Sequence, residues 1–171
     1  MNTNSDVLIR KMNEDDYEIM AKWLSTEAVL EFYGDVNSPF DLEKVKEKYE
    51  PRIAGEVPVT PYIVELGETP IGYIQKYSLS EEKKVEFGYS SHDQVYGIDQ
   101  FIGVQNLFNK GIGTKMVRQF IDYFFGNKGA NIVILDPEVS NIRAIKCYEK
   151  CGFSKVRLIE EGNNWLMECC V

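Results

Sequence analysis

The chain has 171 residues, enough for one domain with a sizeable core, and its 44% hydrophobic and 27% charged residues are typical of globular proteins. The formal net charge of −8 argues against nucleic acid as a ligand, because nucleic-acid-binding domains are basic. This charge favours a cationic partner, although solubility alone is the simpler explanation. The sequence has no apolar run of membrane-spanning length and begins with the polar segment MNTNSD, so we expect a cytoplasmic protein with no membrane partner.

The N-terminal part predicts a strand followed by helices. The strand covers 7–10. Asn13 then has the features of an N-cap, because three acidic residues follow it in the first helical turn. Apolar residues at helical spacing predict a helix with one buried face, and 28–32 continue as a short helical piece. Asp41 caps a second helix, which Pro51 is expected to kink or end.

The middle of the chain predicts a β-hairpin. Its strands are 62–66 and 71–78, joined by a turn at Gly67-Glu68. The charged stretch 81–84 is expected to be a solvated turn, and 85–89 an extra strand or extended segment.

The C-terminal part alternates between strands and helices. The expected elements are a strand at 98–103, a helix at 111–125 ended by Gly126 and Gly129, a strand at 131–135, a helix from Ser140 or Asn141 to 151, and strands at 155–159 and 165–170. This order predicts an α/β (α+β) domain with a mixed sheet. Ligands of such domains bind at the carboxyl ends of parallel strands. Asp99 lies within one of these strands, and Asp136 ends the next.

The turn that opens the helix at 111–125 predicts an anion site. Gly111 and Gly113 allow close approach of a ligand to the backbone, and the first N–H groups of a helix are unpaired at its positive end. Lys110 and Lys115 flank the turn. The stretch fits neither a P-loop nor the dinucleotide fingerprint, whose third glycine is replaced by Met116.

The cysteines and the single histidine predict no metal site. Cys147, Cys151, Cys169 and Cys170 form no C-x-x-C pair, so neither zinc nor a thioredoxin-type site is implied. Without a secretion signal we expect reduced, mostly buried thiols. His92 lies in the polar stretch SSHDQ, which is typical of a surface loop.

Several segments together resemble one family. They occur in the family's order and are LEFYG (30–34), VYGIDQFIG (95–103), NKGIGTK (109–115), VILDP (133–137) and NIRAIKCYEKCGF (141–153). They resemble the aminoglycoside 6′-N-acetyltransferases of the GCN5-related N-acetyltransferase (GNAT) superfamily. Phe108 departs from the family pattern, which has Gln or Arg there. The resemblance implies a single GNAT domain over 1–171, with a mixed central sheet of six to seven strands and about four helices.

The resemblance also implies acetyl-CoA as co-substrate and a set of residues that bind it. Backbone amides of the glycine turn would hold the pyrophosphate, the strand at 98–103 would pair with the pantetheine arm, and Asn141 would contact the pantetheine or cap its helix. The implied cofactor-binding residues are Phe101, Ile102, Lys110, Gly111, Ile112, Gly113, Thr114, Asn141, Ala144 and Tyr148.

The chemistry of amine acetylation explains why carboxylates matter. An ammonium must be bound and then lose a proton before it attacks a thioester, and a carboxylate suits both tasks. The resemblance assigns this to Asp99, favoured as the base, and to Asp136, although a salt-bridged strand acid and a turn cap are the simpler interpretations. Backbone N–H groups near Phe101 or Ile102 would stabilise the oxyanion. Tyr148 would protonate the leaving thiolate; otherwise it is a core aromatic.

A cationic aminoglycoside would need acids for its amines and aromatic rings for its sugars. The candidate residues are Trp23, Glu27, Tyr33, Asp35, Glu86 and Asp93, together with Asp99 and Asp136. Trp23 lies on the apolar stripe of its helix and is well explained as core, whereas Tyr33 and Asp35 follow a helix beside a glycine, a better place for a pocket. Glu86 and Asp93 fit a solvated surface.

The main expectation is therefore transfer of acetyl from acetyl-CoA to the 6′-amine of aminoglycosides such as kanamycin, giving antibiotic resistance, by a monomer or homodimer. One alternative is a GNAT enzyme acting on a polyamine or a protein N-terminus. The other is a non-catalytic acyl-CoA-binding module, which would have no need of Asp99, Asp136 and Tyr148 together.

Overall fold

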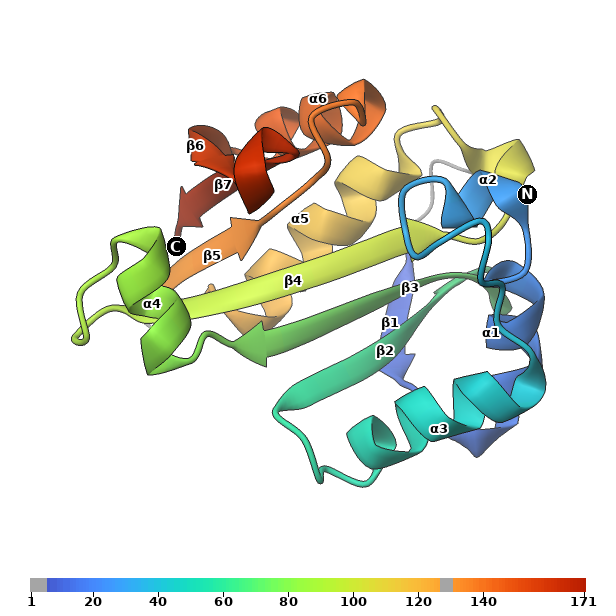
Figure 1. Cartoon of the computed structure of the whole chain (residues 1–171). Coiled ribbons are helices and arrows are strands. Elements are labelled where there is room, and N and C mark those ends of the chain that lie inside the picture. Colours follow the sequence, from blue (N-terminus) through green and yellow to red (C-terminus); the bar gives the residue numbers. More distant parts are fainter. Residues whose placement is uncertain (1–5, 127–130) are drawn as a thin grey trace. The chain divides into compact units, whose positions relative to one another are not determined.

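Figure 1 shows the computed structural model of the chain, which describes residues 6–126 and 131–171. The chain divides into two compact units. The first comprises Met1–Gln75 and Gln100–Gly113, and the second comprises Lys76–Asp99 and Thr114–Val171. No helix in the described parts of the chain is long and apolar enough to cross a bilayer.

The described residues form a sheet of seven strands in the order β1-β2-β3-β4-β5-β7-β6. The strands are β1 (Leu8–Lys11), β2 (Val59–Leu66), β3 (Thr69–Ser78), β4 (Gln94–Ile102), β5 (Asn131–Leu135), β6 (Ser154–Ile159) and β7 (Asn164–Cys170). β4 and β5 are parallel, whereas β1–β2, β5–β7 and β6–β7 are antiparallel. The mixed sheet and its number of strands are as predicted, and the hairpin turn at Gly67-Glu68 is confirmed.

The helices are α1 (Tyr17–Trp23), α2 (Glu27–Leu30), α3 (Leu42–Ile53), α4 (Glu81–Phe87), α5 (Ile112–Phe124) and α6 (Ile142–Lys150), with 3₁₀ turns at Glu14–Asp16, Gln105–Leu107 and Glu160–Gly162. Asn13 and Asp41 are N-caps as predicted. Pro51 lies inside α3, which continues to Ile53. Gly126 follows α5 as expected, while Gly129 falls outside the described residues.

The prediction of a turn followed by a strand at residues 81–89 is wrong. They contain α4, because Ser80 accepts a hydrogen bond from the Lys83 N–H as N-cap and Gly88 ends the helix at φ 83°. The apolar residues that suggested a strand separate on the helix: Val85 is 78% exposed, whereas Phe87 is 6% exposed.

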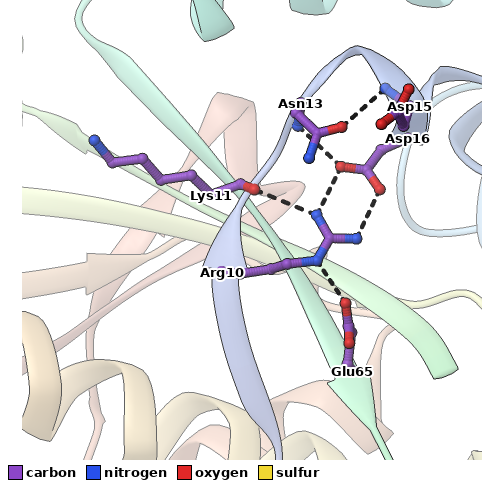
Figure 2. A network of polar contacts seen from close by, with 6 residues as sticks. All are labelled: Arg10, Lys11, Asn13, Asp15, Asp16 and Glu65. Atoms are coloured by element: carbon purple, nitrogen blue, oxygen red, sulfur yellow. Dashed lines mark hydrogen bonds and ion pairs between the residues drawn. The ribbon is translucent and has the colours of Figure 1, made fainter. Parts of the chain in front are cut away.

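The N-terminal edge of the first unit is held by an ion-pair network around Asp16 (Figure 2). Asp16 is only 4% exposed, and its two carboxylate oxygens accept hydrogen bonds from the Arg10 guanidinium at 2.8 and 2.9 Å. Arg10 Nε also donates to Glu65 in β2 at 2.5 Å. Asp16 Oδ2 further accepts the Asn13 N–H at 2.9 Å, completing a capping box. One carboxylate therefore ties β1 to the first helical turn.

Aromatic rings fill the core of the first unit. Tyr73 stacks on Phe101 with ring centroids 5.6 Å apart, and Trp23 meets Phe101 edge-on at 6.0 Å. Gly103 must be glycine, because a Cβ there would approach the Trp23 indole to 2.3 Å.

The second unit contains most of α5, together with α6 and the strands β5, β6 and β7. Ile112, Met116, Phe120 and Phe124 recur every four residues along α5, as expected of an amphipathic helix; the first three are buried and Phe124 is half-buried. The prediction of mostly buried thiols is wrong: Cys147, Cys151 and Cys169 are half-buried and Cys170 is exposed. Cys147 and Cys151 belong to the C-terminal end of a nine-residue surface helix, which cannot enclose them.

Candidate active site

Two carboxylates meet at the carboxyl end of the parallel strands β4 and β5, which lie next to each other in Figure 1. Gly97 of β4 is opposite Ile134 of β5, and the same offset brings Asp99 opposite Asp136. Both side chains are half-buried. Burial, and then the negative charge of Asp99, raises the pKa of Asp136 to about 7. The structure thus brings together the two acids predicted from the sequence.

Tyr77 of β3 joins these acids, and the sequence analysis missed it. Its ring lies across Gly97, where a Cβ would approach the phenol oxygen to 2.4 Å. Gly97 and Asp99 face the same side of β4, since side chains alternate along a strand. Burial, followed by the charges of Asp99 and Asp136, raises the pKa of Tyr77 far above its ordinary value. Tyr77 is therefore a neutral hydroxyl beside two carboxylates, and the glycine within β4 was the available clue.

Further charges act on Asp136. Glu160 raises the pKa of Asp136 and Lys83 lowers it, both less than burial and Asp99 do. Glu160 has a φ of 52°, in the left-handed region that non-glycine residues rarely adopt. Lys83 forms an ion pair with Glu86 at 2.9 Å. The acids near Asp136 give this part of the second unit a negative potential that suits a cationic ligand.

The residues expected to bind the acceptor lie in different settings. In the second unit, Glu86 is exposed in its ion pair, and Asp93 accepts the Ser90 N–H at 2.9 Å. In the first unit, Trp23 is 3% exposed and belongs to the aromatic core. The Tyr33 ring packs 4.6 Å from that of Phe101.

Glu27 and Asp35 are exposed residues of the first unit. Glu27 begins α2, and Asp35 accepts the Asn37 N–H at 2.8 Å. Both remain predicted acceptor residues.

The glycine turn has the backbone conformation of a helix entrance. Gly111 has φ 79° and is exposed, and no atom lies within 4 Å of a Cβ built on it. Glycine is therefore needed there for its backbone angle rather than for space. Ile112, 1% exposed, begins α5, and Lys110 is exposed beside the turn. The first N–H groups of α5 follow directly, which is the arrangement that binds phosphate.

The remaining predicted residues are placed on or beside α6 and β4. Asn141 caps α6 as predicted, and its side-chain oxygen accepts the Ala144 N–H at 3.3 Å. Tyr148 is 6% exposed, and its ring packs 6.2 Å from that of Phe153. On β4, Phe101 is 7% exposed and Ile102 is half-buried. The roles predicted for them in cofactor binding and proton transfer remain predictions.

Comparison with known proteins identifies the class. The family model of the acetyltransferase (GNAT) domain matches residues 12–160. The chain therefore belongs to the GNAT acetyltransferase family.

Several of its relatives are named for the same activity. Aminoglycoside N(6′)-acetyltransferase type 1 of Klebsiella pneumoniae is 35% identical over 154 residues, which cover 90% of this chain and 77% of that protein. The structure of AAC(6′)-Ib with paromomycin and acetyl-CoA has a TM-score of 0.80 at 32% identity, covering 97% of this chain and 94% of that one. The structure of AAC(6′)-Ib with coenzyme A and kanamycin has a TM-score of 0.79 at 32% identity, covering 96% of this chain and 95% of that one.

Proposed function

We propose that this protein transfers the acetyl group of acetyl-CoA to the 6′-amine of aminoglycosides such as kanamycin, and so confers resistance to them. The observation that carries the proposal is the pairing of Asp99 with Asp136 at the end of two parallel strands. The names of the relatives and the net charge of −8 both support a cationic acceptor. Acetylation would convert a charged amine of the drug into a neutral amide.

The two carboxylates would bind the acceptor ammonium and remove its proton. A base works best when its pKa lies near the working pH, and burial with a second acid produces this at Asp136, whose pKa is about 7. The family resemblance favours Asp99 as the base, whereas the raised pKa of Asp136 suits it to take up a proton as well, so the two acids would share the tasks of binding the ammonium and removing its proton. Tyr77, neutral and packed across Gly97, would keep water away and offer its O–H to the carboxylates.

Acetyl-CoA is the proposed co-substrate, and the glycine turn carries the argument for it. The N–H groups after Gly111, with Lys110 alongside, suit its pyrophosphate. In the second unit, we assign pantetheine contacts to Asn141 and Ala144 and proton donation to the leaving thiolate to Tyr148. The oxyanion would be stabilised by N–H groups at Phe101 or Ile102.

The test is release of free CoA thiol from acetyl-CoA with kanamycin as acceptor, followed by mass analysis of the product. We expect a single acetyl group on the 6′-nitrogen. Asp99→Asn should lower kcat by about 10²–10⁴-fold, typical of losing a general base, while CoA affinity stays unchanged. The matched control is Asp122→Asn, which alters an exposed carboxylate of α5.

Two results would overturn the proposal. Full turnover by Asp99→Asn would remove Asp99 as the base. Thiol release with spermidine or an N-terminal peptide but not with kanamycin would replace the acceptor and leave acetyl transfer in place.

A further inference from the structure

The C-terminal end of α6 carries two thiols that meet at one residue of another helix. Cys147 Sγ lies 3.4 Å from the Thr114 hydroxyl, and Cys151 Sγ lies 3.6 Å from the Thr114 carbonyl oxygen, to which it donates. Both cysteines are half-buried, so reagents of small size can reach them. Thr114 belongs to the first turn of α5. None of the acid–base chemistry proposed above uses either thiol.

The surroundings of the two thiols make Cys147 easier to ionise than Cys151. The neighbouring Cys151 thiol is the main cause that lowers the pKa of Cys147, with help from Thr114, Lys150 and Arg118 against the effect of burial. The proximity of Cys147, with burial, raises the pKa of Cys151. Cys147 is therefore the more readily ionised thiol, which makes it the reactive member of the pair.

The spacing of the two cysteines permits a bond between them. Residues four apart on a helix have Cα atoms about 6 Å apart, inside the range of roughly 4.4–6.8 Å found for disulfides. Their Cβ atoms, about 5–6 Å apart, must move closer, so the bond would be strained and easily reduced. Cys151 caps the end of α6 and Gly152 follows with φ 95°, so the last turn can adjust without unwinding the helix.

We propose that Cys147 and Cys151 form a reversible dithiol–disulfide couple that is oxidised by low-molecular-weight disulfides. The Cys147 thiolate attacks the reagent disulfide, forms a mixed disulfide and releases one reagent thiol. Cys151 then loses its proton and attacks the Cys147 sulfur, and the second reagent thiol leaves. The protein loses two protons and two electrons, and the reagent disulfide is reduced to two thiols.

The couple would act on the helix turn that follows Gly113. A disulfide has no S–H, so Cys151 can no longer donate to the Thr114 carbonyl oxygen. In a consequence that rests on the proposed function, oxidation would loosen the first turn of α5 and weaken CoA binding by roughly two- to tenfold, the effect of losing one or two hydrogen bonds.

The experiment treats the reduced full-length protein with glutathione disulfide at neutral pH and maps its cysteines by mass spectrometry. We expect the peptide with Cys147 and Cys151 to lose two hydrogens and to regain them with dithiothreitol. Cys151→Ser should stop the reaction at a glutathione adduct on Cys147, and Cys147→Ser should abolish the couple. Cys170→Ser is the matched control, because Cys170 is exposed, and its variant should still form the bond.

A stable adduct on Cys147 in the unaltered protein, a bond that uses Cys169 or Cys170, or no reaction at α6 would each overturn the couple. The mapping does not depend on acetyl transfer. Titration of the reduced protein with CoA tests the proposed function separately: absence of binding there would refute the cofactor assignment and leave the couple standing.

Discussion

Asp16 and Asp136 show how one residue type serves two purposes. Asp16, 4% exposed in the first unit, is surrounded by donors: the Arg10 guanidinium and the Asn13 N–H. Asp136 in the second unit is half-buried beside other acids, and its pKa is raised to about 7. A carboxylate whose charge is satisfied holds structure together. A carboxylate whose charge is opposed is poised to take a cation or a proton.

The largest change in stability is expected from Asp16→Asn. The variant leaves the partly buried Arg10 with only Glu65 as a charged partner and removes one side of the capping box. We expect a loss of about 2–3 kcal/mol, somewhat less than for a fully buried pair. Urea unfolding followed by circular dichroism measures it. Acetyl transfer per folded molecule should not change.

The neighbouring exposed acid supplies the control. Asp15→Asn changes the same charge next to Asp16, but the Asp15 side chain is exposed. Equal effects of the two variants would show that the Arg10 network contributes no more than surface charge.

Asp136→Asn should have the opposite effect on stability. The pKa of Asp136 in the folded protein, about 7, lies above its ordinary value of 3.8, so between these pH values the folded state binds more protons than the unfolded state. Asp136 therefore makes the folded state less stable as pH rises from about 4 to 7, and the amide removes this cost. We expect a gain of about 1–2 kcal/mol at pH 8 and almost none at pH 4, together with a loss of turnover.

Unfolding curves of both proteins at the two pH values measure this. A variant that is less stable than the parent at pH 8 would mean that the carboxylate is satisfied like Asp16, and the comparison between the two acids would fail.

Some features of the fold and the site could be predicted from the sequence, and others could not, for physical reasons. Caps are local, so Asn13 and Asp41 were found from a few residues, and the pairing of Asp99 with Asp136 followed because parallel strands align their carboxyl ends. The position of Tyr77 could not be found in this way. A tyrosine in a strand faces either side of the sheet, depending on a register that distant residues decide.

The prediction of a turn and a strand at 81–89 failed for a different reason. Its alternating apolar residues fitted a strand, and the capping of α4 by Ser80 and Gly88 outweighed that pattern. The Asp16 network was missed as well, because Arg10 and Glu65 come from strands whose pairing had no local pattern to reveal it.

Tyr77→Phe should give the smallest change in turnover, and it tests most directly how the carboxylate pair ionises. The ring can still cover Gly97, so the fold should be retained, while the O–H dipole next to Asp99 and Asp136 is lost. Because we propose that the phenol O–H donates to the carboxylates, its removal should make them harder to ionise, so the acid limb of the kcat/KM profile should move to higher pH, with turnover at pH 7 reduced roughly threefold.

Tyr89→Phe is the matched control, since the Tyr89 hydroxyl donates to Glu168 at 2.6 Å in the same unit, and its pKa is raised by burial and Glu168 rather than by Asp99 and Asp136. It should leave the acid limb in place whatever it does to stability. If both phenylalanine variants give the profile of the parent, Tyr77 only packs against β4. The ionisation of Asp136 is then governed mainly by burial and by the repulsion from Asp99, because these are the two largest causes of its raised pKa.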